Sequence, residues 1–268
     1  MSRDWALILG ISSGTGAAIA RALAVDPGYA IAGFHRGNHP EAAAALADEL
    51  ERTGVPSRLL IGEAGTFDGV VRGAAELQLP RRSIKLFVHS LANASIGRFV
   101  SGDADQFVHR QFEKTFESMA HSFVYWTQQL VQRDLLAPDA RLLALTNSLH
   151  ESILRQCGMV LASKAALEAY VRHLAWELGP RGIRVNLLKF PTVMTTAARK
   201  VYVRQSEQRL EDQHRRIIPA GRMCTLEEVA RFVSLLCDER GAWVNGAMID
   251  FTGGMTLALL DHVLNGER

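Results

Sequence analysis

Cysteine is scarce in this chain of 268 residues, and its three copies, Cys157, Cys224 and Cys237, show neither CxxC nor metal-ligand spacing. We therefore expect reduced thiols in a cytoplasmic protein, and no metal site. Long apolar runs are also missing, since none approaches the roughly 20 residues that span a bilayer. The first residues lack the long apolar segment and the cleavage site of a signal peptide. We expect no membrane partner.

Excess charge is missing as well. The formal net charge is +2 and the sequence pI is about 8.5, which is too mild to indicate nucleic acid as a partner, and no nucleic-acid-binding motif is present. Hydrophobic residues make up 48 % of the chain and charged residues 22 %, which excludes wholesale disorder. The length suits one large α/β domain, and we expect a single domain over residues 1–268.

Short apolar runs alternate with helical patterns along nearly the whole chain. The runs predict strands over 5–9, 30–34, 58–61, 86–89, 141–146, 184–189 and 247–251. The segments between them predict helices over 14–24, 40–52, 67–76, 107–132, 158–178 and 226–237. Strands separated by such helices form βαβ units. The fold class is therefore α/β, a Rossmann-type doubly wound sheet of about seven mostly parallel strands with helices on both faces.

The first predicted strand runs directly into a glycine-rich turn, and an alanine-rich helix follows. Glycine permits a tight turn and a close approach of the backbone to a pyrophosphate, and the helix N-terminus adds free N–H groups and the positive end of its dipole. The position of the turn, between the first strand and the first helix, supports a dinucleotide-binding function. Six residues of the turn are candidate cofactor ligands: Gly10, Ser12, Ser13, Gly14, Thr15 and Gly16.

The second predicted strand ends at His35 and Arg36. An acidic residue at this point would accept hydrogen bonds from the adenosine ribose hydroxyls and repel a 2′-phosphate, whereas the guanidinium of an arginine can pair with phosphate. The alternative is an exposed loop arginine. We interpret both residues as cofactor-binding and favour NADP(H) over NAD(H).

Three later regions, the first of them in two parts, resemble the short-chain dehydrogenase/reductase family. Residues 162–169 (ASKAALEA) and 178–186 (LGPRGIRVN) are similar to the family's catalytic-lysine helix and the strand after it. Residues 219–230 (PAGRMCTLEEVA) resemble the family's segment that leads into the helix before the last strand, and residues 244–255 (VNGAMIDFTGGM) resemble the last strand and its turn. The likeness extends essentially from end to end.

A second resemblance concerns one branch of that family. Residues 87–92 (FVHSLA) occupy the place of the common Asn-Asn-Ala-Gly motif and are similar to the His-Ser-Ile-Gly or His-Ser-Ile-Ala of enoyl-acyl-carrier-protein reductases. This likeness places Ser90, Leu91 and Ala92 beside the cofactor. Residues 120–124 (AHSFV) also resemble that branch, but the glycine turn has the spacing of the standard branch. The chain combines features of both.

The proton donor of the family is missing. The resemblance implies a Tyr that protonates the substrate oxygen, a Lys that lowers the pKa of that Tyr and holds the nicotinamide ribose, and a Ser that polarises the oxygen. Lys164 matches the lysine and Ser148 the serine. The tyrosine lies four residues before the lysine in the standard branch, here Val160, and seven before it in the enoyl-reductase branch, here Cys157. Met119 aligns with the asparagine of the family's helix.

Three residues are candidate replacements for the tyrosine: Ser148, His150 and Cys157. An imidazole has a suitable pKa, although His150 also fits a solvated loop. A thiol such as Cys157 is more often a small packed hydrophobe. Hydride transfer survives the loss of the tyrosine in principle, because the cofactor carries the hydride. Conjugate reduction tolerates the loss better than ketone reduction does, since an enolate is less basic than an alkoxide.

Residues 191–222 break the alternation of strands and helices, and we expect them to form a substrate lid. The resemblance places Val193 and Thr195 against the nicotinamide carboxamide. The segment 196–222 holds seven basic residues against three acidic ones; the basic residues are Arg199, Lys200, Arg204, Arg209, Arg215, Arg216 and Arg222. They are consistent with a solvated helix face. They are also consistent with a mouth that attracts an anionic substrate, either a carboxylate or a thioester of CoA or an acyl carrier protein.

The leading hypothesis is an NADP(H)-dependent oxidoreductase that reduces an enoyl, enone or carbonyl substrate with an atypical proton donor. The alternatives are a redox-inactive dinucleotide-binding protein and a non-redox enzyme, such as a lyase, cyclase or dehydratase, in the same pocket. The glycine turn, Ser148 and Lys164 favour the first, and the missing tyrosine favours the others. We expect a homodimer or homotetramer, because the helices over 107–132 and 158–178 resemble those of the family's dimer interface.

Overall fold

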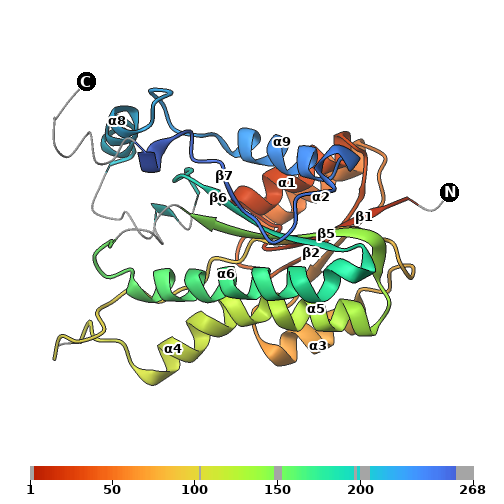
Figure 1. Ribbon diagram of the computed structural model, residues 1–268, viewed down its shortest axis with the longest axis horizontal. Coiled ribbons are helices and arrows are strands. Elements are labelled where there is room, and N and C mark those ends of the chain that lie inside the picture. Colours follow the sequence, from red (N-terminus) through yellow and green to blue (C-terminus); the bar gives the residue numbers. More distant parts are fainter. Residues whose placement is uncertain (1–2, 103, 148–152, 196–197, 200–205, 258–268) are drawn as a thin grey trace.

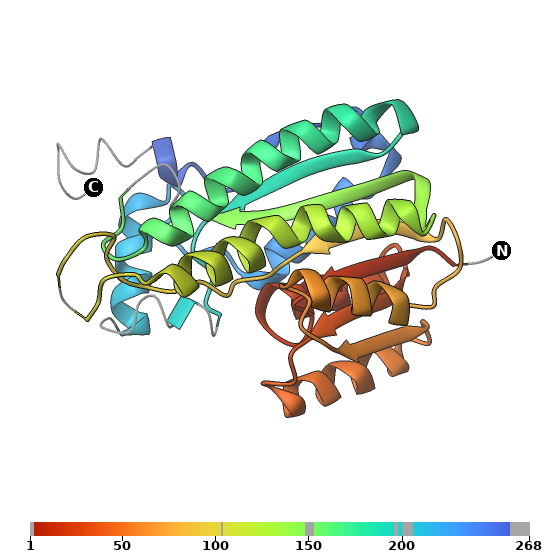
Figure 2. The same cartoon turned by 90° about the horizontal axis from the view of Figure 1, so that it is seen from below.

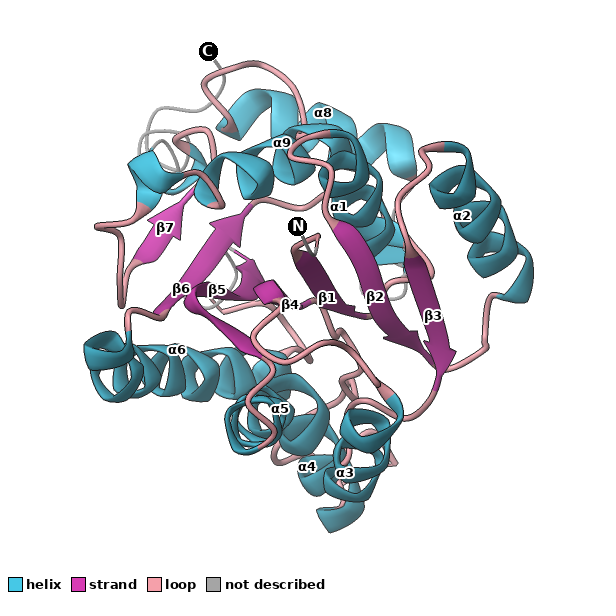
Figure 3. Ribbon diagram, turned by 90° about the vertical axis from the view of Figure 1, so that its right-hand side faces the viewer, coloured by secondary structure: helices cyan, strands magenta, loops and turns pink. Residues whose placement is uncertain are grey.

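The computed structural model describes residues 3–102, 104–147, 153–195, 198–199 and 206–257. Its centre is a seven-stranded sheet in the order β3-β2-β1-β4-β5-β6-β7 (Figure 3). Every pairing between these strands is parallel, which confirms the predicted Rossmann-type sheet. The strands are β1 (Trp5–Leu9), β2 (Ala30–His35), β3 (Ser57–Ile61), β4 (Ile84–His89), β5 (Leu136–Asn147), β6 (Arg184–Phe190) and β7 (Met248–Asp250).

Helices cover both faces of the sheet (Figures 1 and 3). On one face lie α1 (Gly14–Val25), α2 (Pro40–Arg52) and α9 (Leu226–Leu236), and on the other lie α3 (Phe67–Glu76), α5 (Ser122–Gln132) and α6 (Gly158–Leu178). Each face encloses an apolar core, one around Phe34, Phe87 and Trp126 and the other around Ile8 and Ile31. Because both faces are buried, the strands are continuous apolar runs rather than alternating ones.

Side-chain caps fix the start of several helices. The hydroxyl of Thr66 accepts a hydrogen bond from the amide of Gly69 at the start of α3. Thr225 and Glu228 form a reciprocal capping box at the start of α9. Such caps satisfy N–H groups that have no partner inside the helix. They explain why these helices begin where the sequence predicts.

The helix predicted over 107–132 is wrong as a single element. The structure has α4 (His109–Phe116), a π-helical turn (Glu117–His121) and then α5 (Figure 2). The Ser118 hydroxyl donates to the carbonyl of Lys114 at 2.9 Å, and the Ser122 hydroxyl donates to the carbonyl of Ser118 at 3.0 Å. Serine hydroxyls that bond to the preceding turn in this way bend helices, and π turns occur often at functional sites.

A helix within residues 191–222 was not predicted, yet α8 (Glu207–Ile217) lies there. It is strongly polar, and its buried side chains are Leu210 and His214. Leu210 is the one apolar side chain of this buried pair, which is too little to give a recognisable helical period, whereas the Ser206 hydroxyl, which accepts from the amide of Arg209, marks the start of the helix.

The order of the strands places a crevice at the carboxyl ends of β1 and β4. The chain winds outward from β1 through β2 to β3, then returns to β4 on the other side of β1. Open parallel sheets bind their ligands at such a switch point. Among the described residues, no helix is long and apolar enough to cross a membrane.

Candidate active site

Two cavities open at this crevice, with volumes of about 190 and 210 Å³. The first extends from the glycine turn past the ends of β2 and β3, and the second from the ends of β4 and β5 to α6. Both cavities are lined by the same central residues, namely Thr15, Ser90, Leu91, Ala92 and Thr195. The two cavities are therefore neighbouring halves of one cleft, which runs from the ends of β2 and β3 to α6.

The glycine turn forms the floor of the first cavity. Gly10 has φ +80°, and a Cβ there would lie 2.4 Å from the carbonyl oxygen of Ser90. A Cβ on Gly16 would lie 2.3 Å from the carbonyl oxygen of Gly10. Neither position accepts a side chain without displacing backbone. Gly10, Ser12, Ser13, Gly14 and Thr15 line the cavity as predicted, whereas Gly16 supports the turn from behind.

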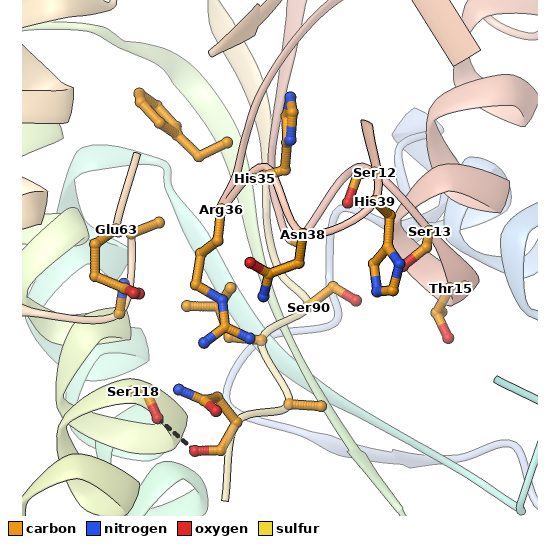
Figure 4. A pocket seen from close by; sticks show the side chains of 18 of the residues that line it. Ser12, Ser13, Thr15, His35, Arg36, Asn38, His39, Glu63, Ser90 and Ser118 are labelled. Atoms are coloured by element: carbon orange, nitrogen blue, oxygen red, sulfur yellow. Dashed lines mark hydrogen bonds between the residues drawn. The ribbon is translucent and has the colours of Figure 1, made fainter. Parts of the chain in front are cut away.

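The two residues at the end of β2 have different positions. Figure 4 shows the Arg36 side chain extending into the first cavity, while the imidazole of His35 points away from it. His35 is buried, burial lowers the pKa of its ring, and Nδ1 accepts a hydrogen bond from the amide of Gly37 at 3.2 Å. His35 therefore braces the turn that presents Arg36. Of this predicted pair, the arginine alone offers its charge to a ligand.

Several residues at this end of the cleft were missed by sequence reasoning. Asn38 and His39 follow Arg36 and face the cavity, and Glu63 lies just after β3 (Figure 4). Ser118, from the π-helical turn, also lines it, and its hydroxyl oxygen lies 2.9 Å from the carbonyl oxygens of both Asn93 and Lys114, which share its one hydrogen. Polar residues that directly follow parallel strands are the signal that would have identified Asn38 and Glu63. Nothing in the sequence marks Ser118.

Lys164, from α6, lines the second cavity. Its Nζ donates a hydrogen bond to the carbonyl oxygen of Leu145 at 2.7 Å. The side chain is buried, and burial lowers the pKa of the ammonium to about 8. Within the described part of the chain, no carboxylate forms an ion pair with it. The cleft therefore holds a buried cation without a counter-ion.

A buried histidine lies near this lysine. His89, the last residue of β4, is fully buried, and its Nε2 lies 2.9 Å from the Ser122 hydroxyl oxygen. The same hydroxyl lies 3.0 Å from the carbonyl oxygen of Ser118, and Nδ1 of His89 has no hydrogen-bond partner in the described part of the chain. Burial first, and the charge of Lys164 second, lower the pKa of His89 to about 3. The ring is neutral and adds no charge to the site.

The positions of the missing tyrosine and asparagine are apolar. Met119, Cys157 and Val160 pack together, with Ala94 and Leu154 against them. Val160 and Met119 line the second cavity, but Cys157 is absent from its lining. The Cys157 thiol is 2 % exposed, and burial raises its pKa. The structure thus places Cys157 behind the cavity wall, while Ser148 and His150 lie outside the described residues.

The predicted lid contributes to both cavities. Val193 lines the second, and Thr195 lies where the two meet, with its Cγ2 3.2 Å from the place of a Cβ on Gly14. Of the seven basic residues, Arg199 pairs with Glu207 and Arg222 with Glu228. Arg209 and Arg215 are exposed on α8, and Lys200 and Arg204 lie outside the described residues. Part of the basic charge is therefore already neutralised.

The cleft fits a nicotinamide dinucleotide. The close approach of Gly10 to Ser90 leaves a cradle that a Cβ would fill, and the Ser13 side chain does not cap α1, so it does not occupy the first N–H groups of that helix. At the other end, the Lys164 ammonium is suited to ribose hydroxyls, and Val193 and Thr195 to a carboxamide. Fold and site together define a Rossmann-type dinucleotide-binding protein.

Comparison with known proteins gives the family. The family model described as enoyl-(acyl carrier protein) reductase matches residues 10–256. The chain belongs to the short-chain dehydrogenase/reductase family, a family of oxidoreductases.

Individual relatives are distant. The chain is 28 % identical over 178 residues to the enoyl-[acyl-carrier-protein] reductase [NADH] FabI of Escherichia coli K12, and this match spans 66 % of each protein. It is 26 % identical over 255 residues to the uncharacterized oxidoreductase YmfI of Bacillus subtilis 168, over 93 % of this chain and 97 % of the relative.

Solved structures support the fold. A short-chain dehydrogenase of Burkholderia cenocepacia J2315 in complex with NADP superposes with a TM-score of 0.77 at 23 % identity, over 94 % of this chain and 98 % of that one. The NADPH-dependent reductase YwfH gives a TM-score of 0.81 at 18 % identity, over 95 % and 98 %. At such identities the likeness is one of architecture.

Proposed function

We propose that the protein is an NADP(H)-dependent reductase that acts on a carbon–carbon double bond conjugated to a carbonyl group. The observation that carries the proposal is the second cavity, which retains a buried, unpaired Lys164 but has Val160 and Met119 in its wall in place of polar partners. A wall without a phenol suits a product anion that is weakly basic, and an enolate is less basic than the alkoxide formed from a ketone.

Arg36 supports the choice of NADP(H). It is exposed and extends into the first cavity beside Asn38 and His39, where a 2′-phosphate would be stabilised by a charge-assisted hydrogen bond (Figure 4). Relatives leave the choice open, because FabI of Escherichia coli is named for NADH and the Burkholderia cenocepacia protein is described in complex with NADP. The proposal therefore depends on the charge of this residue.

Fluorescence titration with NADPH and NADH tests the cofactor choice. We expect NADPH to bind at least several-fold more tightly, and Arg36→Ala to remove most of that difference, a loss of roughly 1.5–3 kcal/mol. Arg72, an exposed arginine of α3 outside the cleft, gives the matched control, and Arg72→Ala should leave both affinities unchanged. Equal affinity of the native protein for the two dinucleotides contradicts the assignment.

Oxidation of NADPH with crotonyl-coenzyme A and with 2-cyclohexen-1-one tests the reaction itself. We expect turnover with at least one of these substrates and little with simple ketones. Binding of NADPH without turnover on any of them would instead indicate a redox-inactive dinucleotide-binding protein or a non-redox enzyme.

An anionic substrate is part of the proposal, on the strength of Arg209 and Arg215, which are exposed on α8. If these charges attract the substrate, kcat/KM for crotonyl-coenzyme A falls as salt rises while kcat changes little. The uncharged enone is the control, and its kcat/KM should not depend on salt. A flat response for both substrates would assign the arginines to a solvated helix face.

We also propose a homodimer or homotetramer formed through α5 and α6. His121, Tyr125 and Tyr170 form a ring cluster between these helices and keep part of their surface exposed, and the Tyr170 hydroxyl lies 3.0 Å from Nδ1 of His121. Light scattering after size-exclusion chromatography measures the mass, and a monomer at micromolar concentration would contradict this part of the proposal.

A further inference from the structure

We propose that Lys164 itself is the proton donor of the reaction, in place of the missing tyrosine. Among the described residues that line the second cavity, it is the one with an ionisable side chain. The inference rests on the proposed function, since a proton donor is required only if the substrate is reduced.

The contacts of the lysine suit this role. One hydrogen of Nζ is used in the bond to the Leu145 carbonyl, which leaves two for a ligand in the cavity. A carbonyl oxygen accepts a hydrogen bond from a neutral amine as well as from an ammonium, although the bond from the ammonium is the stronger of the two. The anchor of the side chain therefore survives loss of the proton, whereas an ion pair with a carboxylate would oppose that loss.

Few of the described groups around Lys164 stabilise the protonated form of its side chain. From β4, His89 is the titratable side chain that interacts electrostatically with Lys164, and its ring is neutral. From the π-helical turn and from α6 itself, Met119 and Val160 contribute no charge. Burial consequently lowers the pKa of Lys164 to about 8. An acid in this range is protonated at neutral pH and still transfers its proton readily.

The proposed reduction has two steps, addition of a hydride and then transfer of a proton from Lys164. The β-carbon of the substrate accepts a hydride, which the bound dinucleotide supplies, and the electrons of the C=C bond move to the carbonyl oxygen to give an enolate. The Lys164 ammonium transfers one proton to this enolate, and a neutral amine remains. One hydride, which carries two electrons, and one proton then complete the reduction, and the amine regains a proton from water after the product leaves.

Two substitutions separate proton donation from cofactor binding. Lys164→Arg keeps a cation with several donors but cannot release a proton, because a guanidinium stays protonated throughout the pH range of the assay. We expect NADPH affinity, from fluorescence titration, to stay within about threefold and turnover of crotonyl-coenzyme A to fall at least about a hundredfold. Lys164→Met should lose affinity as well. An arginine variant with turnover within tenfold of the native value would overturn the proposal.

A second test, an NMR titration of the lysines together with a pH profile of kcat, uses the native protein and requires no variant. The chain has only five lysines, at positions 85, 114, 164, 189 and 200, so lysine labelled with ¹³C at Cε gives few signals. We expect one signal to titrate near pH 8 in the NADPH-free protein and kcat for reduction to fall as pH rises through the same range. A kcat that stays constant up to pH 10, or a Lys164 signal that titrates only above pH 10, contradicts the proposal.

Failure of this inference differs from failure of the proposed function. If the native protein reduces crotonyl-coenzyme A but Lys164→Arg does so equally well, the reductase stands and the lysine is a cofactor ligand alone. Loss of turnover in His150→Gln, together with an active Lys164→Arg, would assign the proton to the histidine. If the native protein binds NADPH and reduces none of the substrates, both proposals fail.

Discussion

Lys164 and Lys189 are both almost completely buried, at 6 % and 3 % exposed, yet their charges are stabilised in different ways. Lys189, near the end of β6, forms an ion pair of 2.7 Å with Asp250 of β7, which also accepts hydrogen bonds from the amide and hydroxyl of Thr252. Lys164 has the carbonyl of Leu145 as its partner and no carboxylate in the described part of the chain. The first arrangement holds a structure together, and the second keeps a proton exchangeable.

The buried charge of Lys164 reduces the stability of the folded protein. A buried charge without a counter-ion destabilises the folded state, and a stable protein retains one only where chemistry requires it. We therefore expect substitutions of the two lysines to change stability in opposite directions.

Lys189→Met should destabilise the protein by about 2 kcal/mol, because the substitution removes an ion pair whose ammonium is buried, while the Asp250 carboxylate that remains is 44 % exposed and can be hydrated. Urea unfolding at pH 7 gives the free energy of unfolding. The double variant Lys189→Met with Asp250→Leu serves as the control, and it should recover a large part of the loss. No loss in the single variant would show that the pair is not structural.

Lys164→Met should stabilise the protein at pH 7 by about 1–3 kcal/mol, since the substitution removes a buried charge that has no counter-ion. In the unfolded chain the lysine has its ordinary pKa of 10.5, and in the folded protein about 8. Unfolding therefore takes up a proton between these values, and the native protein gains stability as pH rises through this window.

The pH dependence of this gain distinguishes charge from packing. The advantage of Lys164→Met over the native protein should be largest below about pH 8 and should shrink as pH rises toward 10.5, as measured by urea unfolding in buffers across the range. A gain that is independent of pH would mean that methionine merely packs better.

Asp250→Asn should cost about 1 kcal/mol at neutral pH and almost nothing in acid. Burial raises the pKa of Asp250, but hydrogen bonds from Lys189 and Thr252 outweigh this effect and the pKa lies below its usual 3.8. The ion pair therefore contributes its stability above that value and loses it as pH falls through the lowered pKa. Thermal unfolding between pH 2 and 7 should show the native and variant curves converge in acid.

Local sequence patterns predicted the glycine turn at one end of the cleft. They did not predict the directions of side chains, which depend on tertiary packing. The glycine turn was predictable because Gly10 and Gly14 need conformations that other residues rarely adopt. His35 and Arg36 were identified together, but the direction of a side chain at a strand end depends on which face is covered. The sequence alone could not show that Arg36 extends into the cavity whereas His35 points away from it.

The π-helical turn and the charge state of Lys164 could not be predicted from the local sequence pattern. Buried positions recur every three or four residues from Thr115 through Met119, Phe123 and Trp126, so the periodicity is that of one unbroken helix. The lysine was recognisable from its motif, but the absence of a carboxylate beside it is a property of three strands and a helix brought together. Local sequence does not encode such an absence.

The shared wall of the two cavities has a kinetic consequence. Thr195 lies against Gly14 and, with Ser90 and Leu91, lines both halves of the cleft, so we expect a molecule in the second cavity to obstruct the inner end of the first. The two ligands consequently cannot enter in either order with equal ease. The steady state should be that of a compulsory-order mechanism in which the dinucleotide is first on and last off, and a dead-end analogue of the substrate should be uncompetitive against it.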